Sequence, residues 1–145
     1  MVRVVLDANQ FVSALLIPGS KPDAIMGLVR EERIILLLSE AICEEILRVL
    51  TYPKIRNRLN RSDEYLAGFV ERLRSVAVVT PGELSLDPLA TDEDDTKYLV
   101  CAIEGNADYI ISGDRHLKDL KSFQGVRIVD PAAFLEMIGE NSLDA

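Results

Sequence analysis

The sequence predicts an α/β protein in which helices cover both faces of a central parallel sheet of about five strands. Short, continuous apolar runs rich in Val, Ile and Leu alternate along the chain with longer segments of helical spacing. Strands that are apolar throughout are typical of parallel sheets, which are buried on both faces. Parallel neighbours also need long crossover connections, which the intervening helices supply. We therefore expect a three-layer α/β/α sandwich.

Five segments are expected to form the strands. Residues 2–6 read VRVVL and are almost continuously apolar and β-branched, which favours a strand buried on both faces. Residues 34–38, IILLL, form a second run of the same kind. Residues 76–79 form a shorter strand, which Pro81 and Gly82 close. The last two strands are expected at 109–111 and 126–129.

The segments between these strands carry helical spacing and helix-capping residues. Ser39 and Ser62 suit the N-cap positions of two helices, and Thr91 suits that of a third. Pro53 is expected to stop one helix, and Pro131 to begin the last one. The helices expected are 9–17, 21–32, 40–51, 62–74, one that opens with the acidic run 92–95 and ends at Gly105, and 131–138, with a loop at 83–90.

Length and composition indicate one soluble domain. A chain of 145 residues is long enough for a sizeable core, and we expect a single domain over 1–140 with a frayed tail at 141–145. No apolar run approaches the ~20 residues that span a bilayer. The opening MVRVVLDANQ enters a strand-like run at once and lacks a signal-peptide layout. These features favour a cytoplasmic protein without a membrane association.

The cysteines and the histidine limit the kinds of site that the chain can form. Cys43 and Cys101 each lie in a helical apolar pattern without metal-type spacing, so we expect reduced, packed thiols. His116 is the single histidine, which excludes a site built on several histidines.

The net charge of -8 argues against broad, non-specific binding of nucleic acid. A local basic patch is nevertheless present in the segment KIRNRLNR, residues 54–61, and Arg72 and Arg74 follow on the next expected helix. This segment could be a solvated connection between helices. It could equally contact the phosphate backbone of a nucleic acid beside an acidic site.

Acidic residues stand at four places where the expected topology gathers them. Asp7 closes the first strand and Asp114 follows the strand at 109–111, where open α/β sheets place their sites. Glu45 and Asp95 lie near the starts of expected helices. Like charges that close repel unless a cation lies between them, and hard carboxylate oxygens suit Mg²⁺ or Mn²⁺. The pattern predicts a divalent-metal site, of a kind that commonly cuts phosphodiester bonds.

Asp7 and Asp114 each have a simpler structural interpretation. Asp7 could act only as a helix N-cap, a role for which Asn9 competes. Asp114 could belong to an ordinary Gly-Asp turn. Ser112, two residues earlier, could hold a neighbouring carboxylate or a metal-bound water through its hydroxyl.

The two helical acids have alternatives as well. Glu45 borders the expected buried stripe and could be a surface glutamate at its edge. The run 92–95 could serve the helix macrodipole, although four acids exceed that need. Asp95 precedes Tyr98 by three residues and so leans toward the buried face, whereas Asp92 and Asp94 could be caps or solvated neighbours.

Together these segments resemble the PIN-domain family, and more closely the VapC-like toxins of bacterial and archaeal toxin–antitoxin systems. LDANQFVSALL is similar to the family's strand–Asp–x–Asn–helix opening, and SEAICEEILRVL to its second motif. DEDDTKYLVCAIEGNADYIISGD is similar to the combined third and fourth motifs. The resemblance covers nearly the whole chain and rests on the order and spacing of the motifs.

The resemblance implies a function and a site. Asp7, Glu45, Asp95 and Asp114 would form the acidic metal cluster, with Asn9 and Ser112 as polar supports. The family often has Thr after its first Asp, where this chain has Ala8, which affects only fine positioning. The implied fold is the PIN α/β/α sandwich, and the implied activity is a Mg²⁺- or Mn²⁺-dependent endoribonuclease acting on RNA. A VapB-like antitoxin and a homodimer are implied too.

Other interpretations fit the residues less well. An aspartyl phosphatase would want a second Asp where this chain has Asn9, and a phospho-receiver domain would want an acidic pair and a late lysine. No glycine-rich nucleotide loop is present, which argues against an NTPase or a dinucleotide enzyme. A non-catalytic module that binds a nucleic acid or a partner remains the alternative outside enzymes.

Overall fold

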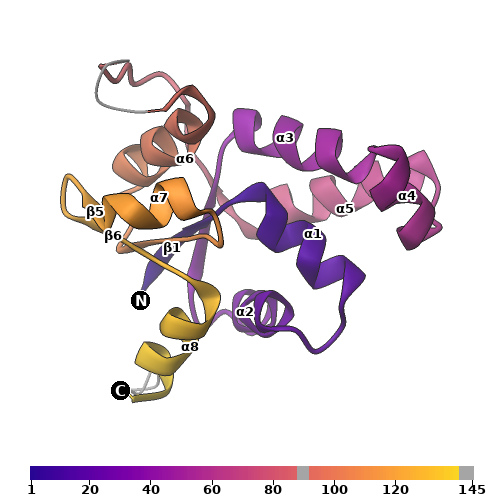
Figure 1. The fold of residues 1–145 in the computed structure, drawn as a ribbon, viewed down its shortest axis with the longest axis horizontal. Helices are drawn as coiled ribbons and strands as arrows, with labels where there is room; N and C mark the ends of the chain where they lie inside the picture. Colours follow the sequence, from indigo (N-terminus) through magenta and orange to yellow (C-terminus); the bar gives the residue numbers. More distant parts are fainter. Residues whose placement is uncertain (88–91, 141–145) are drawn as a thin grey trace.

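The protein folds around a six-stranded sheet whose helices lie on both faces (Figure 1). The computed structural model describes residues 1–87 and 92–140. The order of the strands is β3-β2-β1-β4-β6-β5, and all neighbours are parallel except β5 and β6. The strands are β1 Arg3–Leu6, β2 Ile35–Leu38, β3 Val78–Val79, β4 Tyr109–Ile111, β5 Ser122–Phe123 and β6 Val126–Val129.

The fold has three layers, because the helices that connect the strands lie on both faces of the sheet. Helix α6 packs against β1, β2 and β4, while α1 packs against α2 and α3, away from α6 in Figure 1. Helix α8 closes against α2. The helices are α1 Ala8–Leu16, α2 Lys21–Arg30, α3 Glu40–Leu50, α4 Pro53–Leu59, α5 Asp63–Val76, α6 Glu93–Glu104, α7 Arg115–Leu120 and α8 Pro131–Glu140.

The core lies between the central strands and the helices. Side chains of β1, β2 and β4 such as Val5, Leu37 and Ile110 are fully buried, as expected for strands that are apolar throughout. Ile42 and Ile46 of α3 are also fully buried. Cys43 and Cys101 are free thiols inside this core, which confirms the expectation for both.

Short polar side chains fix the starts of the helices. The Ser39 hydroxyl accepts a hydrogen bond from the Ile42 N–H at 3.3 Å, and the Ser62 hydroxyl accepts one from the Tyr65 N–H at 3.1 Å. Both caps were expected, and each satisfies an N–H group that the helix leaves unpaired. The expected cap Thr91 lies outside the described residues, and Asp92 caps α6 by accepting from the Asp94 N–H at 3.0 Å.

Three segments differ from the sequence-based expectation. Residues 53–59 form a helix, α4, rather than only a connection, because Pro53 occupies its first turn, where proline is tolerated. The segment after Asp114 contains a short helix, α7, and an edge strand, β5, neither of which was expected. Gln124 and Gly125, both with positive φ, join β5 to β6 as a tight antiparallel hairpin. The expected tail at 141–145 lies outside the described residues.

Candidate active site

The topology brings the four predicted acids to one open cavity of about 320 Å³. Asp7 and Asp114 follow β1 and β4, which are parallel neighbours, so their carboxyl ends meet at the same edge of the sheet. Asp95 comes from the first turn of α6, and Glu45 from α3. The cavity is lined by Asp7, Asn9, Glu45, Arg48, Asp94, Asp95, Lys97, Tyr98, Asp114 and Leu117.

Asp7 is both a helix cap and a wall of the cavity. Its side chain is buried, with 4% exposure, and it accepts a hydrogen bond from the Gln10 N–H at 3.2 Å. It also accepts a hydrogen bond from the hydroxyl of Ser112. The capping role that competed with the site role in the sequence therefore exists, yet it does not remove the carboxylate from the cavity.

Ser112 ties Asp7 to the turn that carries Asp114. Its fully buried hydroxyl donates to Asp7 and accepts from the Asp114 N–H at 2.9 Å. The Asp114 carboxylate in turn accepts from the His116 N–H at 2.7 Å and so caps α7. A buried hydroxyl with both partners satisfied fixes the relative position of the two carboxylates.

Asp7 and Asp95 carry negative charge that the folded chain only partly compensates. Burial raises the pKa of Asp7, an effect opposed by the hydrogen bonds from Ser112 and Gln10 and reinforced by the nearby charge of Asp114. Burial also raises the pKa of Asp95, which is 5% exposed, and repulsion from Asp114 adds to that increase. The charges of Asp7, Asp95 and Asp114 are thus close enough to repel, which favours binding of a cation.

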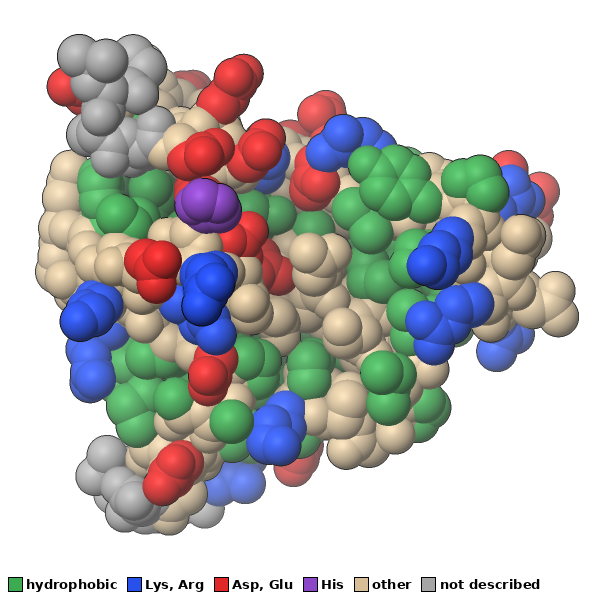
Figure 2. Space-filling view, viewed as in Figure 1, with side chains coloured by type: hydrophobic (Ala, Val, Ile, Leu, Met, Phe, Trp, Pro, Cys, Tyr) green, Lys and Arg blue, Asp and Glu red, His purple; other side chains and the backbone are tan. Residues whose placement is uncertain are grey.

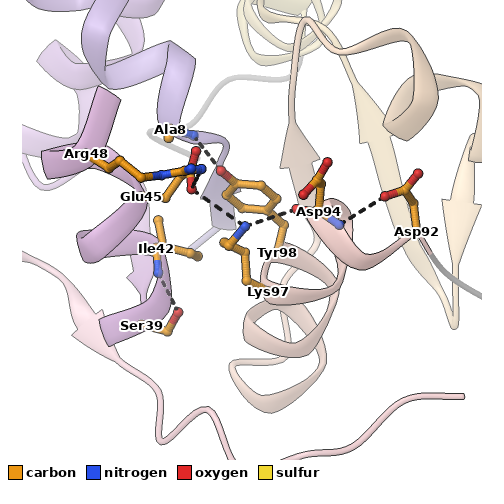
Figure 3. Close-up of polar contacts among 9 residues, drawn as sticks. All are labelled: Ala8, Ser39, Ile42, Glu45, Arg48, Asp92, Asp94, Lys97 and Tyr98. Carbon is orange, nitrogen blue, oxygen red and sulfur yellow. Dashed lines mark hydrogen bonds and ion pairs between the residues drawn. The ribbon is translucent and has the colours of Figure 1, made fainter. Parts of the chain in front are cut away.

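Glu45 is paired with two cations, Arg48 and Lys97 (Figure 3). Arg48, one turn further along α3, forms an ion pair and hydrogen bond with its carboxylate. The Lys97 ammonium of α6 lies 3.9 Å from the same carboxylate and donates to the Asp94 carbonyl oxygen at 3.2 Å. The Glu45–Lys97 contact therefore bridges α3 and α6 across the cavity.

Tyr98 lines the cavity close to both Asp7 and Glu45, whose charges act on its phenol. Its ring is buried, and its hydroxyl accepts a hydrogen bond from the Ala8 N–H at 3.1 Å, at the first residue of α1 (Figure 3). Burial raises the pKa of Tyr98, so the phenol stays neutral at physiological pH. Tyr98 thereby anchors α6 to the end of β1 and forms a wall of the cavity.

Of the remaining candidate residues, Asn9 and Asp94 line the cavity and Asp92 does not. Asn9 is exposed and lines the cavity, and Asp94 lines it too. Asp92 is the N-cap of α6 and is absent from the lining residues that the structure describes. The sequence left open whether Asp92 or Asp94 contributes to the site. Asp94 lines the cavity, whereas Asp92 serves as the N-cap of α6.

The donor set suits a hard divalent cation in kind, because it consists of carboxylates with hydroxyl and amide neighbours. In residues 1–87 and 92–140, no three histidine, cysteine, aspartate or glutamate side chains converge closely enough to hold a metal ion. Within the cavity, the Glu45 carboxylate is held by Arg48 and Lys97. For a metal ion to bind Glu45 as well as the aspartates, the Glu45 carboxylate would have to leave Arg48 and Lys97.

Four residues of the cavity lining were not found as site residues from the sequence: Arg48, Lys97, Tyr98 and Leu117. A signal existed for Arg48, which lies three residues after Glu45 and so on the same side of α3. Lys97 and Tyr98 follow directly on the acidic run, but their contacts reach α3 and α1, respectively. Such contacts depend on how α6 crosses the sheet, which no local pattern encodes.

Comparison with known proteins identifies the family to which this cavity belongs. A family model described as the PIN domain matches residues 3–116, a span that includes all four acids. This chain belongs to the PIN-domain family. PIN domains are generally nucleases that use divalent metals, so the fold is of nuclease type. A relative, an uncharacterized protein of Methanocaldococcus jannaschii, is 34% identical over 120 residues, covering 83% of this chain and 76% of the relative.

In the part of this PIN domain that the structure describes, no helix is long and apolar enough to cross a membrane.

Proposed function

We propose that this PIN-domain protein is a Mg²⁺- or Mn²⁺-dependent endoribonuclease that hydrolyses RNA phosphodiester bonds in the acidic cavity. One observation carries the proposal: Asp7, Glu45, Asp95 and Asp114, which come from four separate elements, line the same cavity. Membership of a nuclease family supports it. The raised pKa values of Asp7 and Asp95 support it as well, since uncompensated acidic charge is what a cation would relieve.

The roles of the side chains follow from their positions. Asp7, Asp95 and Asp114 would hold the divalent ion, which supplies charge neutralisation at the phosphate and acidifies water. Ser112 would keep the Asp7 carboxylate turned into the cavity. Glu45 would share a second ion or accept a proton from the attacking water, once its carboxylate leaves Arg48.

We further propose that the protein is the toxin of a VapBC-type pair, as the resemblance of its motifs to VapC-like toxins implies. A VapB-like antitoxin would then cover the acidic cavity with an Arg or Lys side chain, because a cation can take the place of the metal charge. Homodimerisation belongs to the same proposal. A cytoplasmic location would suit the two free, buried cysteines, since reduced thiols persist in a reducing compartment.

A second candidate function is a PIN-fold module that binds nucleic acid or a partner without catalysis. The pairing of Glu45 with Arg48 and Lys97 is the observation that favours it, because these cations partly neutralise one of the four acids. The two candidates differ in one property only: a nuclease cleaves RNA when a divalent metal is added, whereas a binding module does not.

The test is incubation of the purified protein with a pool of structured and unstructured RNA in Mg²⁺, Mn²⁺ or EDTA. Wild-type protein is compared with Asp7→Asn and Asp114→Asn, and Asp119→Asn serves as a control because Asp119 is an exposed acid of α7 outside the cavity. We expect metal-dependent fragments from wild-type and Asp119→Asn protein, and rates lower by orders of magnitude from the two cavity variants. Fragments that persist in EDTA or with Asp7→Asn would refute the assignment.

A further inference from the structure

A basic and aromatic patch lies where α4 meets α5, outside the acidic cavity. We propose that this patch, made of Arg58, Arg61, Tyr65 and Arg72, is a docking site for the single-stranded RNA that the cavity would cut. The proposal rests on the nuclease function proposed above and extends it to the form of the substrate and the path that it takes. We call these four residues the Arg–Tyr patch.

The Arg–Tyr patch is built around an exposed tyrosine ring. The guanidinium carbon of Arg61 lies 4.7 Å from the centroid of the Tyr65 ring, and that of Arg72 lies 5.5 Å from it. Tyr65 keeps 37% of its surface exposed although its helix packs against the core. Contacts with two guanidinium groups restrain the Tyr65 ring before any ligand arrives, which lowers the entropic cost of binding.

A shallow depression of about 150 Å³ adjoins this ring. It is lined by Arg58, Leu59, Arg61 and Tyr65, together with Leu15 and Leu16 at the end of α1. Its walls therefore combine an aromatic face, leucine side chains and two arginines. An unpaired base could lie in such a depression while its phosphates meet the arginines.

The cations of the patch are available to an anion. Residues 52–61 contain four basic and no acidic side chains in a chain of net charge -8. Arg56 is occupied by an ion pair with Asp63 at 3.1 Å. Among the described residues, Arg58, Arg61 and Arg72 form no ion pair with a carboxylate, so their N–H groups can donate to phosphate oxygens.

Helix α1 connects the patch to the acidic cavity. Asp7, at the start of α1, lines the cavity, and Leu16, at its end, lines the depression. Nine residues of helical rise separate them, or about 14 Å. Figure 2 shows several acidic side chains over α6, both acidic and basic side chains around α7, and basic side chains near α4. A short stretch of an extended strand can therefore contact both sites at once.

The chemistry favours a single strand of RNA over other ligands. A base can stack on the Arg–Tyr patch, on the tyrosine ring or on a guanidinium plane, only if that base is unpaired, because the bases of a duplex are stacked on one another. An acidic protein segment would satisfy the arginines but would leave the aromatic ring and the neighbouring acidic cavity without a role. Charge, aromatic surface and position together point to a nucleic-acid strand.

The experiment measures binding separately from cleavage. Fluorescence anisotropy in EDTA follows the affinity of the protein for a fluorescein-labelled, unstructured RNA of twelve nucleotides, at several salt concentrations. The variants are Arg61→Gln/Arg72→Gln and Tyr65→Leu. Arg127→Gln is the matched control, because the Arg127 guanidinium carbon also lies over a tyrosine ring, 5.8 Å from the Tyr109 centroid, at the start of β4 and away from the cavity.

We expect wild-type protein to bind the RNA and Tyr65→Leu to weaken binding roughly 5- to 100-fold through lost stacking. The double arginine variant should weaken binding and reduce the salt slope by about 1.4, since each phosphate contact to a single strand contributes about 0.7. Arg127→Gln should leave both quantities unchanged. Melting temperatures within a few degrees of wild type establish that each variant is folded.

The proposal is overturned if wild-type protein does not bind the RNA, if both patch variants match Arg127→Gln, or if an acidic peptide competes as well as RNA at equal charge. The nuclease proposal is judged separately, by cleavage of the same RNA in Mn²⁺. Binding through the patch without cleavage would refute the nuclease and keep the patch. Cleavage with the same KM in wild-type and patch variants would refute the patch and keep the nuclease.

Discussion

At the scale of single residues, Asp7 illustrates how a site residue opposes stability. Its carboxylate is buried beside the Asp114 charge, and burial raises its pKa above the unfolded value of 3.8. The folded protein therefore binds this proton more tightly than the unfolded chain does. The Asp7 contribution to stability is then greatest below pH 3.8, and it is lost as the pH rises from there through the raised folded pKa.

The first prediction concerns Asp7→Asn in EDTA. Asparagine caps helices as well as aspartate does and carries no charge, so the variant should melt above wild type at pH 7. The difference should shrink toward zero as the pH falls below the raised pKa of Asp7, because the wild-type carboxyl is then neutral too. Thermal melts between pH 3.5 and 7.5 measure it. A variant that is less stable than wild type at pH 7 would contradict the account.

The second prediction concerns Arg48, which competes with any cation for Glu45. Removing it in Arg48→Gln should tighten Mn²⁺ binding roughly 2- to 5-fold, the range expected for an exposed ion pair. Arg74→Gln is the control for loss of an arginine from ion pairs outside the cavity, since it breaks the pairs with Glu71 and with Glu40. Equal Mn²⁺ affinities for both variants would mean that Arg48 does not restrain Glu45.

At the scale of elements, the position of α6 depends on how closely its end approaches β2. A Cβ atom added at Gly105, directly after α6, would lie 2.7 Å from a methyl group of the fully buried Leu37. It would also lie 3.1 Å from the Cys101 carbonyl oxygen, in the last turn of α6. Glycine at this point therefore lets the helix that carries Asp95 and Lys97 lie close to the sheet.

The third prediction follows from that contact. Gly105→Ala should destabilise the protein by about 1–3 kcal/mol, because the methyl group has no space in a packed core. Gly139→Ala is the control, since nothing lies within 4 Å of an added Cβ there and alanine favours a helix. Urea denaturation of both variants measures the difference. If Gly105→Ala were as stable as Gly139→Ala, the close approach of α6 to Leu37 would be wrong.

Elements could be predicted where local signals sufficed. Ser39 and Ser62 predicted the starts of their helices, because capping depends on residues only three positions apart. Helix α4 and strand β5 were missed for different reasons. Pro53 favours the end of the preceding helix, but proline also suits the first turn of a new one. Ser122–Phe123 is too short to be recognised as a strand without its partner β6.

At the scale of the whole molecule, the parallel topology is what turns four distant acids into one site. Asp7 and Asp114 could be placed from sequence because both follow strands, and the ends of parallel strands share an edge. The cations that restrain Glu45 could not be placed fully, because Lys97 reaches it across two packed helices.

The fourth prediction concerns the effect of a divalent metal on the stability of the whole fold. Because Mg²⁺ or Mn²⁺ would bind the folded chain and not the unfolded one, adding either should raise the melting temperature. The increase should be about 5–10 °C at a metal concentration of roughly 100 times the dissociation constant. Asp114→Asn should remove most of this increase, and its metal-free melting temperature should be no lower than that of wild type, because loss of the Asp114 charge relieves repulsion of Asp7 and Asp95. An equal increase in the variant would place the bound metal elsewhere.

The most direct test of the central claim is calorimetric titration of the wild-type protein with Mn²⁺. The account predicts saturable binding that Asp7→Asn and Asp114→Asn abolish and that Asp119→Asn leaves intact. No binding by folded wild-type protein, or binding that survives in both cavity variants, would contradict the claim that these carboxylates form the metal site of a nuclease.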